Sequence, residues 1–314
     1  MRVFVTGASG HVASAVIPEL VSAGHTVIGL ARSDSSAAVV RSLGAEVFRG
    51  DLDDLKGLAA AAHQADGVIH LAFKHDMQQS GNLTEAVEAD LRAIAAMSTP
   101  LIGTGKPFVG TNATGALALA GFDGQLTEHD TRPGGLRIDA ENTVIALADD
   151  GVRSSVVRLP PAVHGDGRYG LVSDLIAIAR ATGVSGHAGE GNNRWPSTDV
   201  RDVGRLYRLA LESAAAGTRV HAVAEEGITI REIAELIGRH LDIPVRAITS
   251  QERQQHFGHF SMFAGLDNPT SSQITRDALG WTPTRPGLLA DLAQDRDLNS
   301  RLNGQNSEAP TTSS

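Results

Sequence analysis

The stretch Thr6-Gly7-Ala8-Ser9-Gly10-His11-Val12-Ala13 decides the fold of this chain. It follows a short apolar run at residues 3–5 and leads into a helix-period segment at residues 12–23. Gly7 permits a tight turn, Gly10 lets the backbone approach a pyrophosphate, and Ala13 suits close packing of helix on strand. The N–H groups and positive dipole end of the helix then face the anion. A purely structural glycine-rich turn is the alternative, but the strand before and the helix after it favour a dinucleotide phosphate site.

Short apolar runs alternate with helix-period segments through the first half of the chain. We expect strands at residues 3–5, 26–30, 46–48, 68–71, 108–110 and 155–159, and helices at residues 12–23, 37–43, 53–62, 83–102 and 139–149. Several of these strands are apolar at consecutive positions, as strands covered on both faces are. The alternation predicts right-handed βαβ units and an α/β fold with a doubly wound parallel sheet, the Rossmann architecture.

The second half is expected to be a smaller region that binds substrate. Helices are predicted at residues 171–182, 200–215 and 229–241, and a strand at 219–223. The predicted division gives 1–165 to the dinucleotide-binding domain, with 198–225 returning to it, and gives 166–197 and 226–303 to the substrate-binding region. Residues 304–314 lack periodicity and are expected to be disordered. Segment 254–269 is rich in phenylalanine, which indicates either a helix packed on a core or an apolar lid.

Composition excludes several classes of function. The 314 residues include 36 acidic and 27 basic side chains, a formal net charge of −9, and no cysteine. The acidic balance argues against nucleic acid as a partner, and the lack of cysteine excludes disulfides and thiolate metal sites. No apolar stretch approaches the roughly 18–20 residues that span a bilayer, and the first residues lack the features of a signal peptide. We expect a cytoplasmic protein that binds a small molecule, with no membrane partner and no metal.

Five further motifs accompany the turn. They are Gly50-Asp51-Leu52-Asp53-Asp54, His70-Leu71-Ala72, Arg158-Leu159-Pro160-Pro161-Ala162-Val163-His164-Gly165, Asp199-Val200-Arg201-Asp202-Val203-Gly204 and Ala278-Leu279-Gly280-Trp281-Thr282-Pro283. With the turn, they resemble the extended short-chain dehydrogenase/reductases, the NAD(P)-dependent epimerase/dehydratase-like group. The third motif departs from the family pattern by an inserted Leu159 and by His164 in place of tyrosine. The resemblance implies an NAD(P) cofactor bound by Gly7, Ser9, Gly10, His11, Val12, Asp51, Leu52, Leu71, Ala72, Phe73 and Pro160.

The residues after the second strand indicate which dinucleotide binds. Arg32 stands 22 positions after Gly10, where the specificity residue is expected, and Ser33 follows as a further donor. An arginine there accommodates the 2′-phosphate of NADP, which we favour. The alternative is that Arg32 is a solvated charge and Asp34 binds the 2′-hydroxyl of NAD.

The family's catalytic tyrosine and lysine have no counterpart in this sequence. Counting back from Glu141 places Pro133 at the tyrosine position and Arg137 at the lysine position. Proline cannot transfer a proton. Arg137 either holds the ribose or a phosphate of the cofactor, or is a surface charge. The chain has two tyrosines; we assign Tyr207 to a helix in the core.

Three hydroxyl side chains are the candidates for a catalytic role. Thr111 and Thr114 fall at the site of the family's Ser/Thr and are predicted to bind a carbonyl, unless they satisfy local backbone groups. Tyr169 follows the sixth strand and is the other candidate proton donor. Arg194 and Trp195 either clamp a substrate or pack within a loop.

Two functions follow from these observations. The first is an NAD(P)-dependent oxidoreductase of the atypical extended short-chain type, acting on a small carbonyl, alcohol or sugar-like compound. The alternative is a non-catalytic NADP(H)-binding redox sensor or regulatory protein, which the loss of the tyrosine–lysine pair favours. A full-length substrate region favours the enzyme, because a sensor needs no pocket.

Overall fold

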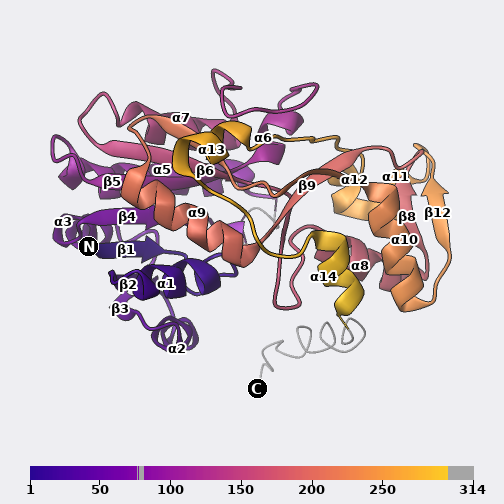
Figure 1. Cartoon of the computed structure of the whole chain (residues 1–314), viewed down its shortest axis with the longest axis horizontal. Helices are drawn as coiled ribbons and strands as arrows, with labels where there is room; N and C mark the ends of the chain where they lie inside the picture. The colour runs from indigo at the N-terminus through magenta and orange to yellow at the C-terminus, as the bar shows by residue number, and fades with distance from the viewer. Residues whose placement is uncertain (76, 78–80, 296–314) are drawn as a thin grey trace.

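A seven-stranded sheet forms the centre of the first lobe (Figure 1). The computed structural model describes residues 1–75, 77 and 81–295. The sheet order is β10-β6-β5-β4-β1-β2-β3, and every neighbouring pair is parallel. The strands are β1 (Arg2–Thr6), β2 (Thr26–Ala31), β3 (Glu46–Arg49), β4 (Gly67–His70), β5 (Pro107–Ala113), β6 (Arg153–Leu159) and β10 (Thr218–His221). The predicted doubly wound sheet is confirmed, and its strand order reverses between β1 and β4, where such sheets bind ligands.

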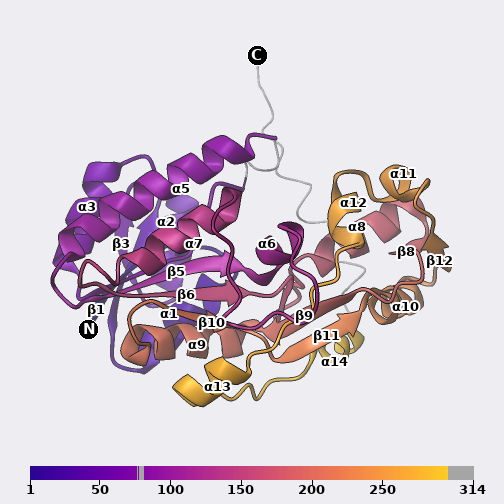
Figure 2. The same ribbon diagram turned by 90° about the horizontal axis from the view of Figure 1, so that it is seen from above.

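Helices cover both faces of this sheet. Helices α1 (Ala13–Ser22), α2 (Asp34–Ser42) and α9 (Val200–Ser213) share one apolar cluster, and α3 (Leu55–Gln64), α5 (Leu83–Ser98) and α7 (Leu136–Ala146) share another. Figure 2 shows α3, α5 and α7 on one side of the sheet and α1 and α9 on the other. Helix α1 turns Val16, Ile17 and Leu20 inward at helical spacing, which is why this segment is a helix packed on a sheet.

The second lobe is built from short strands and helices. Strands β7 (Ala162–His164), β9 (Arg194–Asp199) and β11 (Glu225–Thr229) form a sheet in the order β11-β9-β7, and β8 (Ser185–Ala188) pairs with β12 (Val245–Ile248). Around them lie α8 (Val172–Thr182), α10 (Ile230–Leu241), α11 (Arg253–Phe257), α12 (Ser261–Ala264) and α14 (Leu288–Gln294) (Figure 1). A third apolar cluster fills this lobe. Short helix α6 (Thr114–Leu119) follows β5, and α13 (Gln273–Leu279) returns to lie against α9 and β10.

Several helix boundaries differ from the sequence prediction for local reasons. Helix α2 starts at Asp34 rather than at residue 37, because the Ser33 side chain accepts a hydrogen bond from the Ser36 N–H and forms a capping box. Helix α7 starts at Leu136, so Arg137 lies in its first turn. The helix predicted at 83–102 ends at Ser98 and continues as the 3₁₀ turn Thr99–Leu101.

The phenylalanine-rich segment packs on the core of the second lobe. Phe257 and Phe260 are buried in its apolar cluster, and Phe263 packs against them from the edge. This arrangement supports the prediction of a packed segment rather than a lid. The predicted disordered tail at 304–314, and the end of the predicted substrate region, lie outside the described residues. Among the described helices, none combines the length and apolar character that crossing a bilayer requires.

Candidate cofactor and active site

The glycine-rich turn between β1 and α1 packs directly on the end of β4. Gly7 has a φ of +64°, and a Cβ placed on it would lie 2.8 Å from the backbone N of Ala72. Only glycine fits there without moving residues 71–72. The Gly10 N–H donates to the Gly7 carbonyl at 2.9 Å and closes the turn, while Ser9 and Gly10 stay exposed. The turn is therefore rigid and open to solvent.

The start of α1 presents backbone donors beside this turn. The first backbone hydrogen bonds of the helix are donated by the N–H groups of Ser14 and Ala15. Within the described part of the chain, the N–H groups of His11, Val12 and Ala13 have no backbone acceptor. The His11 ring lies near Val163 and Arg168, and burial, together with the charge of Arg168, lowers its pKa. Consecutive N–H donors at a helix start fit the pyrophosphate of a dinucleotide.

Two arginines lie at the carboxyl ends of β2 and β3. Arg32 follows β2 directly and is exposed, and Ser33 is the N-cap of α2. Arg49, the last residue of β3, donates to the Ser33 carbonyl at 2.5 Å and pairs with Asp34. The sequence interpretation missed Arg49, because only the sheet order brings the ends of β2 and β3 together.

Other predicted cofactor residues line the same edge of the sheet. Asp51 uses one carboxylate oxygen to accept the N–H groups of Asp53 and Asp54, at 2.9 and 3.2 Å, and so shapes the turn after β3. Leu52 is buried under it, and Leu71 and Ala72 are half-buried beneath Gly7. Pro160 is buried after β6.

A buried polar network connects the phosphate turn to α7. The Thr6 hydroxyl lies 2.6 Å from His70 Nδ1 and accepts the Ala72 N–H at 3.2 Å. His70 Nε2 lies 3.0 Å from Asp90 Oδ1, and Arg137 donates to Asp90 Oδ2 at 3.4 Å. Burial lowers the pKa of Arg137. These residues come from β1, β4, α5 and α7.

Arg137 also lies over an aromatic ring. Its guanidinium carbon is 3.8 Å from the centre of the Phe73 ring, a cation–π contact. The side chain is 25% exposed, so Arg137 is not the surface charge that was the alternative. The sequence interpretation missed Asp90, although its position in α5 among Ala86, Ala93 and Ile94 places a carboxylate on the apolar face, which is a detectable signal.

Thr111 has its hydroxyl proton engaged. Its Oγ1 donates to the His70 carbonyl at 2.7 Å and lies 2.7 Å from the Tyr207 hydroxyl, which must then be the donor in that pair. Tyr207 is fully buried, as predicted, and burial raises its pKa. Thr111 therefore offers a ligand an acceptor rather than a donor.

The other two catalytic candidates are buried and paired. Thr114 accepts a hydrogen bond from Asn268 Nδ2 at 2.8 Å, in a contact that joins the two lobes. Tyr169 lies in the core of the second lobe, and its hydroxyl donates to Asp295 at 2.7 Å. This placement argues against the proton-donor role suggested for Tyr169, because its proton is engaged away from the phosphate turn.

A second buried network, of hydrogen bonds and ion pairs, holds helix α7 in place. Arg158 donates to both oxygens of Glu141, at 2.5 and 3.0 Å, and Asn112 and Arg219 donate to the same carboxylate. Burial alone would raise the pKa of Glu141, but the hydrogen bonds and charge of Arg158 hold it below its ordinary value. Glu141 lies one helical turn after Arg137, so this network fixes the helix that carries Arg137.

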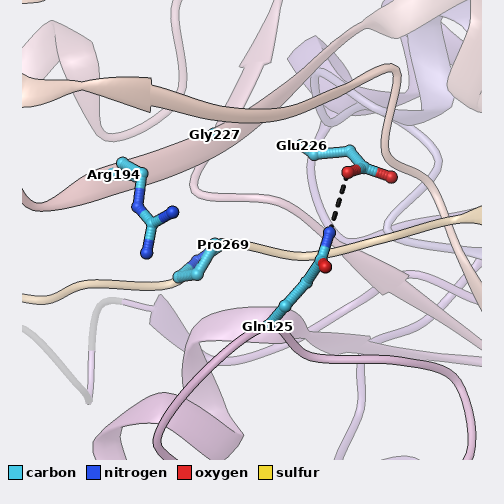
Figure 3. Close-up of a pocket in the computed structure, with 5 residues that line it drawn as sticks. All are labelled: Gln125, Arg194, Glu226, Gly227 and Pro269. Atoms are coloured by element: carbon cyan, nitrogen blue, oxygen red, sulfur yellow. Dashed lines mark hydrogen bonds between the residues drawn. The ribbon is translucent and has the colours of Figure 1, made fainter.

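A hollow of about 280 Å³ lies between the two lobes, lined by Gln125, Arg194, Glu226, Gly227 and Pro269 (Figure 3). Gln125 donates to Glu226 across it at 2.8 Å, and Arg194 pairs with Asp267 at 2.9 Å. None of the predicted cofactor residues lines it. Trp195 is fully buried in β9 and donates to the Leu266 carbonyl, so it packs rather than clamps a ligand. No cluster of metal-ligating side chains occurs within residues 1–75, 77 and 81–295.

Comparison with known proteins identifies the family. Residues 7–130 match the protein family described as NAD(P)H-binding. Protein C2A9.02 of Schizosaccharomyces pombe is 45% identical over 295 residues, which is 94% of this chain and 99% of the yeast protein. The structure of UDP-glucuronic acid 4-epimerase from Bacillus cereus, in complex with UDP-glucuronic acid and NAD, has a TM-score of 0.74 at 16% identity, covering 96% of this chain and 100% of that chain.

The chain belongs to one family with this yeast protein, carries an NAD(P)H-binding domain, and shares its fold with the epimerase. The resemblance read from the sequence is thereby confirmed, and with it an NAD(P) cofactor. A more distant relative, the 2-alkyl-3-oxoalkanoate reductase of Stenotrophomonas maltophilia, is 29% identical over 227 residues, covering 69% of this chain and 67% of that enzyme. This chain departs from the tyrosine–lysine pattern of the family that its motifs resemble, since residues 173 and 211, four after its two tyrosines, are Ser and Leu.

Proposed function

We propose that this protein is an NADP(H)-dependent oxidoreductase that interconverts a small carbonyl compound and its alcohol. The observation that carries the proposal is the open turn, with donors at His11, Val12 and Ala13, which a buried network through His70 and Asp90 connects to the Arg137–Phe73 pair. The relative that is named as an oxoalkanoate reductase supports a carbonyl substrate. The cofactor supplies or accepts the hydride.

The residues of the chain then bind the cofactor, orient the substrate and stabilise negative charge on the substrate oxygen. The turn and the start of α1 hold the pyrophosphate through backbone N–H groups and the helix dipole. Gly7 keeps residues 71–72 close to the turn, and Phe73, which follows them, lies under the Arg137 guanidinium. The Arg137 donors that do not face Asp90 are placed to stabilise negative charge on a substrate oxygen. Because proline occupies the tyrosine position and the Thr111 proton is engaged, we propose that water supplies the proton.

Arg32 supports NADP as the preferred form. It is exposed at the carboxyl end of β2, and Arg49 adds a second positive charge from β3. Asp34, which would bind the 2′-hydroxyl of NAD, is paired with Arg49 instead. Two guanidinium groups at this end suit a 2′-phosphate.

A non-catalytic role is the second candidate, and specific observations favour it. The hydroxyl protons of Thr111 and Tyr169 are engaged, and Thr114 is fully buried. A protein that binds NADP(H) to report redox state needs the turn but no proton donor.

The deciding experiment measures binding and turnover separately. Titration of the full chain with NADPH, followed by the fluorescence of the nicotinamide, tests binding. Incubation of the NADPH complex with a panel of aldehydes, ketones and β-oxo acids tests hydride transfer. Binding with turnover supports the oxidoreductase, and binding without consumption of NADPH across the panel supports the sensor. Absence of NADPH and NADH binding rejects both.

A further inference from the structure

The buried carboxylate of Asp90 determines the charge of the site that Arg137 borders. Its side chain is 5% exposed, and its two oxygens face His70 Nε2 and Arg137 Nη1 separately. Because a carboxylate carries no proton to donate, His70 Nε2 must carry one and donate it. Asp90 thus holds two donors from different elements in a fixed relation.

A neutral imidazole satisfies every group in this network. With Nε2–H donating to Asp90, Nδ1 is left to accept the Thr6 hydroxyl proton, while the Thr6 oxygen accepts the Ala72 N–H. The charges are then one carboxylate and one guanidinium, which sum to zero. Arg137 therefore directs N–H donors at the site without adding net positive charge to it.

We propose that Asp90 is a positioning residue that makes this site selective for an uncharged oxygen, a carbonyl or a hydroxyl, and against a carboxylate. The proposal rests on the proposed function and specifies its substrate class. Within the described part of the chain, no hydrogen bond engages Arg137 Nε or Nη2, and Phe73 covers one face of the guanidinium. An anion bound there would gain from Arg137 but would be repelled by Asp90 just behind it.

The test compares two nearly isosteric probes, benzamide and benzoate, on the NADPH-loaded protein. Fluorescence of bound NADPH reports probe binding at about pH 8, above the ordinary titration range of histidine. The unaltered protein is expected to bind benzoate at least about tenfold more weakly than benzamide. Asp90→Asn removes the negative charge and keeps the shape, so benzoate affinity is expected to rise at least about tenfold while benzamide affinity stays similar. Arg137→Gln is expected to weaken both.

Two variants separate this role from structural damage. Glu88→Gln removes one negative charge from the exposed face of the same helix, where Glu88 pairs with Arg92, and is expected to leave both affinities unchanged. In the double variant Asp90→Asn with Arg137→Gln, the gain in benzoate affinity should disappear. The double variant lacks both the Asp90 carboxylate and the Arg137 guanidinium, so it leaves no unpaired buried charge. It should therefore fold even if the Asp90→Asn variant does not.

Each outcome decides the proposal. Equal or tighter binding of benzoate by the unaltered protein overturns it. It is also overturned if the Asp90→Asn variant folds and binds NADPH but its affinity for benzoate does not rise. This includes the case in which the unaltered protein binds neither probe. These results leave the proposed oxidoreductase standing, whereas failure of the unaltered protein to bind NADPH rejects the proposed function and this inference together.

Discussion

Single residues at the phosphate turn carry functions that their neighbours cannot take over. Gly7 sits against Ala72 at a distance that admits no Cβ, while Gly10 has only the Gly7 carbonyl within 4 Å, at 3.2 Å from a Cβ position. Substitution at Gly7 therefore displaces the backbone, whereas substitution at Gly10 mainly fills the space in front of the turn. This difference lets binding be perturbed without perturbing the fold.

Gly10→Asp is expected to abolish dinucleotide binding in a protein that still folds. The carboxylate adds bulk and like charge where the pyrophosphate comes closest. Titration with NADPH and NADH measures the loss, and thermal unfolding checks the fold. Gly24→Asp places the same charge after the far end of α1; it strains the backbone there, where φ is +84°, but leaves the turn untouched and should bind normally. Unchanged affinity of Gly10→Asp for both dinucleotides would contradict the site.

Arg32→Ala is expected to erase a preference for NADPH over NADH. A charge-assisted hydrogen bond to phosphate contributes roughly 1.5–3 kcal/mol, so the unaltered protein should bind NADPH about tenfold or more tightly. Both affinities are measured by titration at modest ionic strength. Arg41→Ala, a substitution near the C-terminal end of α2, is the matched control. Equal affinities in the unaltered protein reject the NADP assignment.

Among the secondary-structure elements, helices α1 and α9 cross at close range. A Cβ on Gly204 would lie 2.8 Å from both the carbonyl carbon and the oxygen of Ala15. Helix α9 buries Val203, Leu206 and Tyr207 in the same cluster as α1. The absence of a side chain at Gly204 sets the distance between the two helices, and with it the position of the phosphate-binding end of α1.

Gly204→Ala is expected to destabilise the protein by about 1–3 kcal/mol, although alanine is the better helix former. The added methyl group must push α9 away from the backbone of α1. Chemical denaturation measures the free energy of unfolding. Gly115→Ala, in helix α6 with its nearest neighbour at 3.7 Å, should be neutral or slightly stabilising. Equal stability of the two variants would show that the crossing tolerates a side chain.

The sequence predicted elements well where the signal was local. The six strands predicted for the first half are all present, because buried parallel strands are apolar at consecutive positions. Strands of the second lobe were missed, because a segment such as Ser185–Ala188 is half polar and is buried only by packing of α8 and α10. The glycine-rich turn could be predicted for the same reason, because its signal lies within one short stretch of sequence. The Asp90–Arg137 and Thr111–Tyr207 contacts span 47 and 96 residues and depend on the tertiary fold.

For the whole molecule, a buried histidine connects the sheet to the segment that returns from the second lobe. His221, at the end of β10, donates from its backbone N to Thr275 at 2.7 Å, and its ring Nδ1 lies 2.7 Å from the Ser271 carbonyl. Nδ1 must therefore carry a proton, and Nε2 accepts from Arg158 at 3.2 Å. Burial, together with the charge of Arg158, lowers the pKa of His221 to about 4.

Stability is expected to fall as the pH drops from about 6.5 to about 4. In this window the unfolded chain binds a proton at His221 and the folded protein does not, so the free energy of unfolding rises with pH by at most about 1.4 kcal/mol per unit. Denaturation at a series of pH values measures the slope. His221→Gln should flatten it, while His63→Gln, on the exposed end of α3, should not. An identical slope in His221→Gln contradicts the assignment.

The crossing of α1 and α9 has a consequence for synthesis of the protein. Helix α9 is completed about 190 residues after α1, yet it covers the side of α1 at Ala15 and belongs to the same apolar cluster as α1. A ribosome that adds about 5–20 residues per second leaves that surface uncovered for roughly 10–40 s. The helix that we propose to bind the cofactor is thus made first and buried late. During that interval the nascent chain presents an apolar stripe to chaperones and to other nascent chains, so its yield depends on how fast translation reaches residue 213.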